Sequence, residues 1–232
     1  MKLDPRLQAI AEYVRKGERV ADIGTDHGYI PIYLVENGIS PKIFATDVNP
    51  GPLDNARRIV EAQGMDKRIE LKLGNGLEPI IGEKLDKVII AGMGGLLIRD
   101  ILIEGEKFIS EVNPRLVLQP MVAQPELRKW LKENRYRVIS ERIAKDRKKF
   151  YEIMLVERGE SSCENLAYDE IGIKMLEEKD PLLMDFVNHK IAKYEKILEN
   201  IKQNAAESEL MNKKTFEIID RIERLKEVLK AI

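Results

Sequence analysis

One short stretch near the start of the chain combines glycines with acidic residues. Residues 20–28 read Val-Ala-Asp-Ile-Gly-Thr-Asp-His-Gly. Val20 and Ile23 favour a short buried strand, whereas a glycine, which lacks a Cβ atom, lets a ligand approach the backbone closely. Asp22 stands where a dinucleotide-binding fold would carry the first glycine of its fingerprint, and a carboxylate at this point repels a pyrophosphate. The stretch therefore predicts a strand, a ligand-binding turn and a helix, and it disfavours a nicotinamide dinucleotide.

The same spacing, an acid followed by Gly-x-x-x-Gly, is typical of enzymes that bind S-adenosylmethionine (SAM). The carboxylate of Asp22 suits the cationic methionine end of SAM. We expect Gly24, Thr25 and Gly28 to line this turn, with SAM as the cofactor. The alternative is an ordinary strand–turn–helix in which Asp26 only caps the helix.

Two further clusters follow the second and third expected strands. Asp47, with Val48 after it, lies about twenty residues beyond the glycine turn, where an acid commonly binds ribose hydroxyls. Asn75 and Gly76 follow the third strand, where an amide can hydrogen-bond an adenine edge and a glycine can admit the ring. A loop-capping aspartate and simple turn chemistry would explain the same residues, so both interpretations stay open.

A second glycine-rich segment, Ala-Gly-Met-Gly-Gly over residues 91–95, is expected as a turn after the fourth strand. It occupies the methyl-transfer position of a SAM-binding fold. Enzymes that methylate an exocyclic amine often carry Asp or Asn followed by Pro-Pro there, and this segment has neither. Backbone groups of Gly92 and Gly94, with Met93 as a soft apolar wall, would position the substrate. This suits a nucleophile that needs no deprotonation, such as a ring nitrogen with an in-plane lone pair.

Side chains that could act in catalysis are few. Asp26 and His27 are the only clustered acid and imidazole expected to face the pocket, and Gln119 and Pro120 end the fifth strand on the side of the target base. No Cys and His residues have the spacing of metal ligands, so no metal is expected. No serine is placed by a motif to form a triad with His27. The candidate catalytic residues are Asp26, His27, Met93, Gly94, Gln119 and Pro120.

These residues need an alternation of strands and helices to bring them together. Apolar runs and turn signals predict strands over 19–23, 42–47, 69–73, 87–91, 116–118, 137–144 and 150–156, and helices after Pro5 and over 29–36, 50–63, 95–105 and 124–134. Alternating strands and helices with nearly continuous apolar strands indicate an α/β protein with a doubly wound, mostly parallel, seven-stranded sheet. The clusters described above follow strand ends, where open α/β sheets bind ligands.

Composition limits the class of protein. Residues 1–159 carry 27 Lys and Arg against 24 Asp and Glu, whereas residues 160–232 carry 12 against 16, so a nucleic-acid footprint must be a local patch. The basic region 128–149 is either a solvated face or a track for phosphates. The single cysteine, Cys163, fits a reducing cytoplasm, where we expect the protein. We expect no signal peptide and no membrane span, because no apolar stretch approaches the roughly 20 residues required.

Two apolar stripes with helical spacing dominate the last part of the chain. The first runs from Leu183 to Ile201 and the second from Ile218 to Ile232, with a short polar segment over 203–208 between them. Such stripes predict an antiparallel coiled-coil hairpin. We therefore expect two domains, a SAM-dependent catalytic domain over 1–159 and a helical domain over 160–232.

Taken together, these motifs resemble the bacterial tRNA (adenine-N1)-methyltransferase family that modifies adenine 22 in the D-arm of tRNA. The shared stretches are ADIGTDHGY (21–29), ATDVNPGPLDNA (45–56), GNGL (74–77), IAGMGG (90–95), LQP (118–120) and KFYEI (149–153). The resemblance covers residues 1–157 by motif and the helical tail by architecture. It implies that the SAM pocket is lined by Asp22, Gly24, Asp26, His27, Gly28, Asp47, Asn75, Gly76 and Met93.

The resemblance implies a SAM-dependent enzyme that methylates N1 of an adenine in tRNA. The target base must then be turned out of its stack, and a carboxylate such as Asp26 would stabilise the cationic product. The alternatives are methylation of another RNA or a small molecule, and a SAM-binding regulatory or scaffold protein. The helical tail is expected to grasp tRNA through cations such as Lys190, Lys193 and Lys196, or else to dimerise, although a monomer is slightly favoured.

Overall fold

The computed structural model describes residues 1–160, 167–204 and 209–232. The chain divides into two compact units, Met1–Ser161 and Ser162–Ile232. Parts of the two segments expected to be polar loops, 158–165 and 203–208, lie outside the described residues, as does Cys163. No helix in the described part of the chain is long and apolar enough to cross a membrane.

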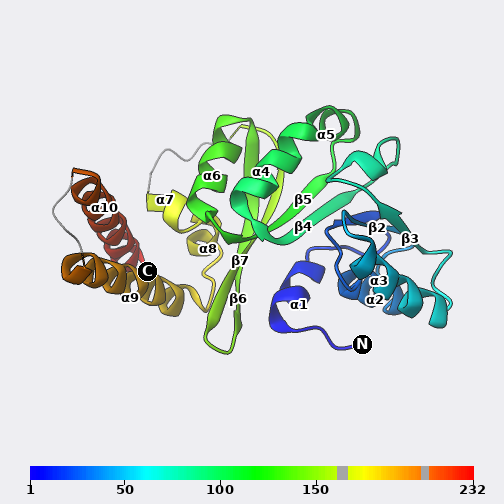
Figure 1. Cartoon of the computed structure of the whole chain (residues 1–232), viewed down its shortest axis with the longest axis horizontal. Helices are drawn as coiled ribbons and strands as arrows, with labels where there is room; N and C mark the ends of the chain where they lie inside the picture. The colour runs from blue at the N-terminus through cyan, green and yellow to red at the C-terminus, as the bar shows by residue number, and fades with distance from the viewer. Residues whose placement is uncertain (161–166, 205–208) are drawn as a thin grey trace. The chain divides into compact units, whose positions relative to one another are not determined.

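The first unit is built on one seven-stranded sheet with the strand order β3-β2-β1-β4-β5-β7-β6 (Figure 1). The five strands from β3 to β5 are parallel, and β7 is antiparallel to both of its neighbours. The strands are β1 (Val20–Ile23), β2 (Ile43–Asp47), β3 (Ile69–Leu73), β4 (Lys87–Gly94), β5 (Arg115–Val122), β6 (Tyr136–Asp146) and β7 (Lys149–Arg158). The predicted mostly parallel, doubly wound sheet is confirmed.

Helices pack on both faces of this sheet and form two hydrophobic cores. The first core joins one face to α1 (Pro5–Ala11), α2 (Tyr29–Glu36) and α3 (Pro50–Ala62). The second core joins the other face to the 3₁₀ turn η1 (Glu78–Ile80), α4 (Gly95–Glu104), α5 (Glu106–Val112) and α6 (Gln124–Glu133). The order of the strands reverses between β1 and β4, and the carboxyl ends of these two strands are therefore the expected place for a ligand.

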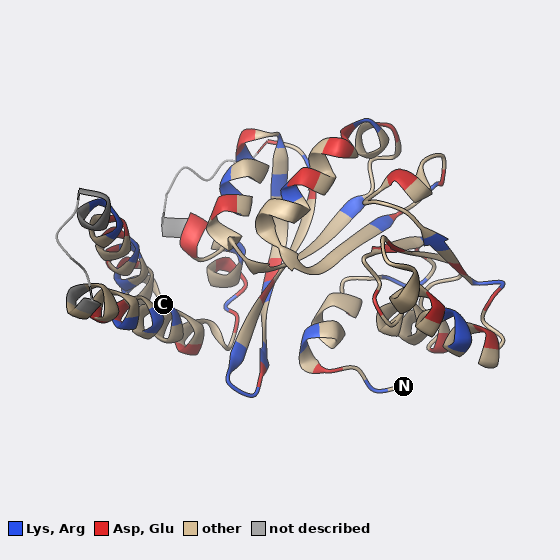
Figure 2. Cartoon of the chain, viewed as in Figure 1, with Lys and Arg blue, Asp and Glu red and all other residues tan. Residues whose placement is uncertain are grey.

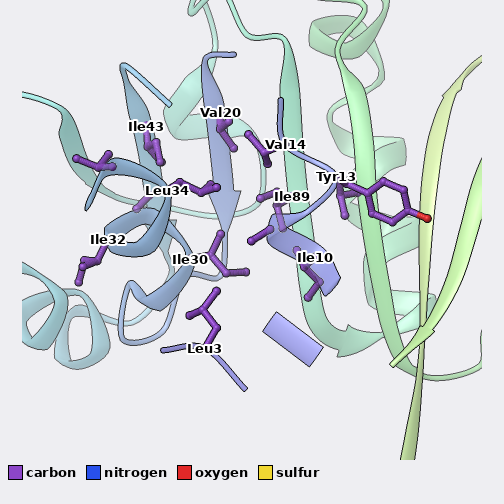
Figure 3. Packing of buried hydrophobic residues seen from close by; sticks show 14 of the residues in the cluster. Leu3, Ile10, Tyr13, Val14, Val20, Ile30, Ile32, Leu34, Ile43 and Ile89 are labelled. Atoms are coloured by element: carbon purple, nitrogen blue, oxygen red, sulfur yellow. The ribbon is translucent and has the colours of Figure 1, made fainter. Parts of the chain in front are cut away.

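Helix α1 begins as the sequence indicates, because the Asp4 side chain accepts a hydrogen bond of 2.8 Å from the Leu7 N–H. Ile10 is completely buried in the first core, and Tyr13 extends toward β6 and β7 (Figure 3). The Tyr13 hydroxyl lies 3.0 Å from the Ser140 Oγ atom of β6. These contacts fix α1 against the β6–β7 hairpin.

Strands β4 and β5 are longer than the apolar runs predicted. The glycine-rich segment expected as a turn over 91–95 instead continues β4 to Gly94, with irregular pairing around Gly92 and Met93. Gly92 has φ +77°, a conformation that glycine adopts without a steric cost and that accommodates a bulge. The turn was expected because glycine usually weakens a strand, but here the extended β5 supplies the partner that keeps the segment in the sheet.

The second unit contains α7 (Ala167–Glu170), α8 (Ile173–Glu177) and the long helices α9 (Leu183–Asn204) and α10 (Glu209–Ala231). The long helices pack on each other. Leu183, Val187 and Ile191 are buried as the first stripe predicts. On α10 the buried face passes through Val228 rather than the predicted Leu229, and Ile232 is 48 % exposed. The second stripe therefore ends one turn earlier than predicted.

A polar network also lies inside this helical unit. The Glu170 side chain is buried, accepts a hydrogen bond of 3.1 Å from the Tyr194 hydroxyl and pairs with the Arg221 guanidinium at 3.3 Å. Burial and the Glu170 carboxylate raise the pKa of Tyr194 to about 12, so its hydroxyl remains a donor at neutral pH. The network links α7, α9 and α10, and the unit therefore has an interior of its own.

Candidate active site

The turn after β1 is shaped by three residues in the left-handed region. Gly24 and Gly28 both have φ +70°, and Asp26 has φ +51°. The N–H groups of Gly24 and Thr25 each donate a hydrogen bond of 2.8 Å to the Thr46 carbonyl of β2. The turn is therefore fixed to the neighbouring strand, with its other side open to a ligand.

Asp22 lies beneath this turn and is 5 % exposed. Its Oδ2 atom accepts a hydrogen bond of 2.7 Å from the Thr25 hydroxyl. Burial raises its pKa to about 6, against the lowering effect of the Thr25 hydrogen bond, with a further raising effect from Asp47 and a lowering one from Arg6. A buried carboxylate of this kind would gain from a bound cation, which would replace the water lost on folding.

Asp47 ends β2 beside the same turn and is 8 % exposed. Its Oδ2 atom accepts the N–H of Asp26 at 3.2 Å, and its Oδ1 atom accepts the N–H of Asn49 at 2.9 Å. An ionised carboxylate has about four acceptor sites, so these two bonds orient the group and leave lone pairs on both oxygens. A vicinal diol such as that of ribose matches this arrangement.

A cavity of about 350 Å³ opens at the carboxyl ends of β1 and β4. Asp22, Gly24, Thr25 and Asp26 line it on one side and Gly92 on another. Predicted residues from both glycine-rich segments thus meet at one cavity, whose size is that of a small-molecule site. The predicted residues His27, Gly28, Asp47, Met93 and Gly94 are not part of its lining. The remaining lining residues are Asp4, Arg6, Leu7, Tyr29, Ile30, Ala91, Met121 and Tyr151.

Gln119 organises the wall of the cavity formed by β4 and β5. It is completely buried, and its Oε1 atom accepts hydrogen bonds from the Arg6 guanidinium at 3.0 Å and from the Gly92 N–H at 3.1 Å. Its Nε2 atom donates to the Pro120 carbonyl at 3.0 Å. Gln119 and Pro120 therefore support the site from within the sheet, and Gln119 acts on the cavity through Arg6 and Gly92.

Met93 covers the first glycine turn. A Cβ atom built on Gly24 would lie 2.2 Å from the Met93 Cε atom, so the methionine methyl group fills the space that any larger residue would need. Gly94 precedes α4 as its N-cap. The soft apolar wall predicted at Met93 thus lies directly over the turn, and α4 starts immediately behind it.

Asp26 and His27 lie at the rim of the cavity. Their side chains are 67 % and 42 % exposed, with His27 Nε2 3.6 Å from Asp26 Oδ1, and the His27 ring packs 5.4 Å from that of Tyr29. Asp26 does not cap the following helix, because the N-cap of α2 is Gly28 and no side-chain hydrogen bond caps that end. The helix-cap alternative is therefore wrong, since His27 and Gly28 separate Asp26 from Tyr29, the first residue of the helix.

Several predicted cofactor residues lie away from this cavity. Asn75 lines a second cavity of about 450 Å³, and its Nδ2 atom donates to Glu104 Oε2 at 3.2 Å. Gly76 is buried against Ile101 of α4. Val48 follows Asp47 with 55 % of its surface exposed. The structure thus brings the methionine-side residues together, whereas Asn75 and Gly76 belong to a neighbouring region.

Three polar or aromatic residues that line the first cavity are not among the predicted site residues. Arg6 comes from α1, Tyr29 from the start of α2 and Tyr151 from β7. The Arg6 guanidinium lies 5.7 Å from the centre of the Tyr151 ring. Because α1 precedes the glycine turn and Tyr151 belongs to the closing hairpin, no motif spacing connects them to the site. The available signals were the helix start in front of the first strand, for Arg6, and the shared stretches ADIGTDHGY and KFYEI, which contain Tyr29 and Tyr151.

The residues of this region fit SAM. Asp22 provides a buried negative charge for the cationic methionine end, Arg6 provides a positive charge on the same cavity, and Asp47 retains free acceptor sites for the ribose. Residue 24 of this turn must be glycine, because a Cβ atom there would lie 2.2 Å from the Met93 Cε atom. Within the described residues no group of three or more His, Cys, Asp and Glu side chains could hold a metal ion.

Comparison with known proteins identifies the family. A family model described as tRNA (adenine(22)-N(1))-methyltransferase matches residues 20–227. The chain is 36% identical to the tRNA (adenine(22)-N(1))-methyltransferase of Bacillus subtilis (strain 168) over 237 aligned residues, which cover 99% of this chain and 98% of that protein.

Solved structures give the same result. The crystal structure of the B. subtilis M1A22 tRNA methyltransferase TrmK matches with a TM-score of 0.86 and 36% identity, covering 98% of both chains. M. capricolum TrmK in complex with S-adenosyl-homocysteine matches with a TM-score of 0.83 and 26% identity, covering 100% of both chains. Sp1610 of Streptococcus pneumoniae in complex with S-adenosyl-L-methionine matches with a TM-score of 0.83 and 33% identity, covering 98% of this chain and 100% of that chain. By its sequence and its fold, this chain belongs to the tRNA (adenine(22)-N(1))-methyltransferase family.

Proposed function

We propose that this protein transfers a methyl group from SAM to N1 of adenine 22 in tRNA. The observation that carries the proposal is the cavity between β1 and β4, where Asp22 and Arg6 place opposite charges beside two glycine-rich segments. Membership of the tRNA (adenine(22)-N(1))-methyltransferase family supports the choice of substrate and position. Since the substrate is tRNA, the proposal places the protein in the cytoplasm.

Each residue of the site has a role in this proposal. SAM supplies an electrophilic methyl group on a sulfonium centre. Asp22 binds the ammonium of the methionine end, Arg6 binds its carboxylate, and Asp47 binds the ribose hydroxyls through charge-assisted hydrogen bonds worth about 1.5–3 kcal/mol each. Asn75 and Gly76 form the adenine end of the cofactor site. Thr25 holds Asp22 in place through its hydrogen bond.

The acceptor nitrogen needs little chemical activation. N1 of adenine attacks through a lone pair in the plane of the ring, so no general base is required and the protein has mainly to orient the base. The backbone around Gly92 and Gly94, fixed by Gln119, forms one wall for the base, and Tyr151 and Met121 form another. Turning the base out of its stack costs a few kcal/mol, which these contacts must offset.

Methylation at N1 leaves a positive charge on the ring. Asp26 lines the cavity and is exposed at its rim, so its carboxylate can stabilise that charge as it develops. The imidazole of His27 lies beside it and helps to hold the carboxylate in place. Asp26 is therefore the proposed catalytic residue, acting electrostatically rather than as a base.

We also assign residues 1–159 to a catalytic domain and residues 160–232 to a helical domain with a coiled-coil hairpin formed by α9 and α10. The apolar faces of the two helices support this assignment, since Val187, Ile191, Ile222 and Leu225 are buried. The helical domain would contact the folded tRNA outside the active site. It would do so as part of a monomer.

The direct test is nucleoside analysis of an unmodified tRNA after incubation with the protein and SAM. We expect 1-methyladenosine at position 22 and none in a matched tRNA with guanine at that position. Methylation at another nucleotide would contradict the assigned position, and methylation of small molecules alone would contradict the substrate class. SAM binding without transfer to any RNA would instead indicate a regulatory protein.

A further inference from the structure

The β6–β7 hairpin ends in three adjacent cations. Arg147, Lys148 and Lys149, called here the hairpin tip, follow β6 and lead into β7, and all three are exposed. Figure 2 shows Lys and Arg residues at the end of this hairpin, where it extends beyond the rest of the sheet. The hairpin tip is therefore a compact positive surface on a rigid two-stranded support.

Most other cations of the basic region have partners within the fold. Arg128 is buried between Glu141 and Glu152, at 2.8 and 2.7 Å. Arg128 therefore attaches α6 to the hairpin and does not belong to a solvated face. The other paired cations are Lys129 with Glu133 at 4.0 Å, Arg137 with Glu157 at 2.5 Å, Arg142 with Glu12 at 2.6 Å, and Lys145 with the Phe150 ring at 4.8 Å.

The hairpin tip differs from these residues. In the described part of the chain, no carboxylate or aromatic ring pairs with the side chains of Arg147, Lys148 or Lys149. Exposed cations without internal partners contribute little to the stability of the fold. Their charges remain available to a partner in solution.

The topology of the sheet directs the hairpin tip toward the active site. β6 is antiparallel to β7, which is antiparallel to β5, so the turn after β6 lies at the same edge as the carboxyl ends of β1, β4 and β5. Tyr151 of β7 lines the cavity, and Lys149 precedes it by two residues, on the same face of the strand. At about 3.4 Å per residue, Lys149 lies about 7 Å from Tyr151 along the strand. Arg147 follows Asp146, which pairs with Lys149, so it lies one residue further along the hairpin, at about 10 Å.

We propose that the hairpin tip binds the backbone phosphates of the nucleotides next to the target adenine. The inference rests on the proposed function, because it assumes that a tRNA nucleotide enters the cavity beside Tyr151. The distances from Tyr151 to the hairpin-tip residues correspond to a separation of one or two nucleotides from that base. Phosphate contacts of this kind fix the register of a nucleic acid without reading its sequence. The near-zero net charge of the chain, −1, makes such a local cluster necessary.

The backbone at Arg147 provides a separate argument. Its φ of +53° is a left-handed conformation, which is unfavourable for a residue with a long side chain and favourable for glycine. Arg147→Gly should therefore raise the melting temperature while it lowers tRNA affinity, whereas a purely structural role predicts that both change in the same direction.

The decisive variant is full-length protein with Arg147→Gln, Lys148→Gln and Lys149→Gln. Its affinity for unmodified tRNA is measured without SAM over a range of KCl concentrations. Each lost phosphate contact lowers the slope of log K against log salt by about 0.7–0.9, so we expect a decrease of about 2. We also expect an increase of at least tenfold in KM for tRNA, with kcat and SAM affinity close to those of the parent.

The matched control removes the same number of charges from the opposite edge of the sheet. Lys16, Lys67 and Lys84 are exposed and precede β1, β3 and β4. The variant with Lys16→Gln, Lys67→Gln and Lys84→Gln should keep the parent salt slope and KM. Equal losses in both variants would overturn the inference in favour of a general charge effect, and a hairpin-tip variant with the parent slope would overturn it outright.

The same measurements separate this inference from the proposed function. If the salt slope of tRNA binding depends on the hairpin tip but the parent leaves adenine 22 unmethylated, the result would contradict the proposed function and support the hairpin tip as a tRNA-binding surface. If the parent and the hairpin-tip variant methylate adenine 22 equally well, the result would support the proposed function and contradict the role of the hairpin tip. A parent protein that does not bind tRNA would contradict both.

Discussion

Arg6 and Gln119 are 113 residues apart in the sequence and are joined by a hydrogen bond of 3.0 Å from the guanidinium to the amide oxygen. The same oxygen accepts the Gly92 N–H at 3.1 Å. One buried side chain therefore positions both a charged residue of α1 and the bulge of β4. The site depends on this contact because Arg6 and Gly92 share the Gln119 amide oxygen as their acceptor.

Replacing Gln119 by leucine should lower kcat/KM for tRNA by about 5- to 100-fold. The change leaves the Gly92 N–H and the Arg6 guanidinium without their shared acceptor, at a cost of about 1–3 kcal/mol. Gln119→Glu keeps the acceptor for both groups but loses the donor to the Pro120 carbonyl, so its activity should lie between those of Gln119→Leu and the parent. Steady-state kinetics with circular dichroism as a check on folding would measure the effect. Parent activity in Gln119→Leu would show that the contact is dispensable.

The parallel sheet and the position of the site could be predicted because they follow from local signals. The apolar strands, the glycines at 24 and 28 and the acids at 22 and 47 each lie within a short stretch, and the rule for carboxyl ends of strands then places them together. The extension of β4 to Gly94 could not be predicted in this way, because it depends on pairing with β5. Glycine content alone favours a turn there.

The contribution of α1 and the closing hairpin also escaped prediction. Arg6 reaches the cavity only because Ile10 and Tyr13 pack α1 against the sheet and β6. Likewise, Tyr151 reaches it because β7 pairs with β5. Such long-range packing has no signature in residue spacing. The alternative that Asp26 only caps a helix is wrong for a local reason, since the N-cap of α2 is Gly28, two residues after Asp26.

Asp47→Ala should weaken SAM binding at least tenfold. The change removes charge-assisted hydrogen bonds to the ribose, and 1.4 kcal/mol corresponds to one decade of affinity. Because Asp47 also orders the turn through the Asp26 and Asn49 N–H groups, Asp47→Asn provides the matched control that keeps one side-chain oxygen. We expect an intermediate affinity for Asp47→Asn. Calorimetry that gives the parent affinity for both variants would reject the role of Asp47.

Asp26→Asn should lower the turnover number strongly and leave the melting temperature nearly unchanged. The side chain is 67 % exposed and makes no helix cap, so its charge contributes little to folding. Its proposed role is to stabilise the positive charge that develops on the base, which asparagine cannot do. Single-turnover rates equal to those of the parent would show that Asp26 only lines the cavity.

SAM affinity should decrease as the pH falls below about 6. The pKa of Asp22 is raised to about 6, chiefly by burial, and only the ionised carboxylate attracts the ammonium of the methionine end. Calorimetry from pH 5 to pH 8 should therefore show weaker binding at the acidic end for the parent. Asp22→Asn should bind weakly at every pH. A parent affinity that is constant over this range would contradict the assignment.

The Asp22 carboxyl has the opposite effect on the stability of the cofactor-free protein, which should decrease as the pH rises. The pKa of Asp22 is raised from 3.8 in the unfolded chain to about 6 in the fold, so the folded state binds the proton more tightly. Its contribution to the free energy of unfolding is therefore full below about pH 4 and is lost as the pH rises through about 6. The loss is about 3 kcal/mol at most. Denaturant titrations should show that the free energy of unfolding decreases with rising pH in the parent but not in Asp22→Asn. The same decrease in both proteins would exclude Asp22 as its source.

The helical domain should be dispensable for folding of the catalytic domain and necessary for tRNA recognition. Its buried residues, such as Val187, Leu225 and the Glu170 network, pack within the unit Ser162–Ile232. The unit Met1–Ser161 has its own two cores. Among the candidate cations, Lys190 already donates to the Glu170 carbonyl at 2.5 Å, whereas Lys193 and Lys196 are exposed. The last two are therefore the better candidates for contact with RNA.

A protein that ends near Gly159 should unfold cooperatively and bind SAM with the parent affinity, but lose most of its tRNA affinity and turnover. The full-length variant with Lys193→Gln and Lys196→Gln is the companion experiment, because it keeps the helical domain and removes only two exposed charges. It should raise KM for tRNA with little effect on kcat. If the shortened protein methylates tRNA at the full-length rate, the helical domain has no role in recognition. If shortening only converts a dimer to a monomer in sedimentation, the domain is a dimerisation arm, because exposed coiled-coil helices often pair with a second copy.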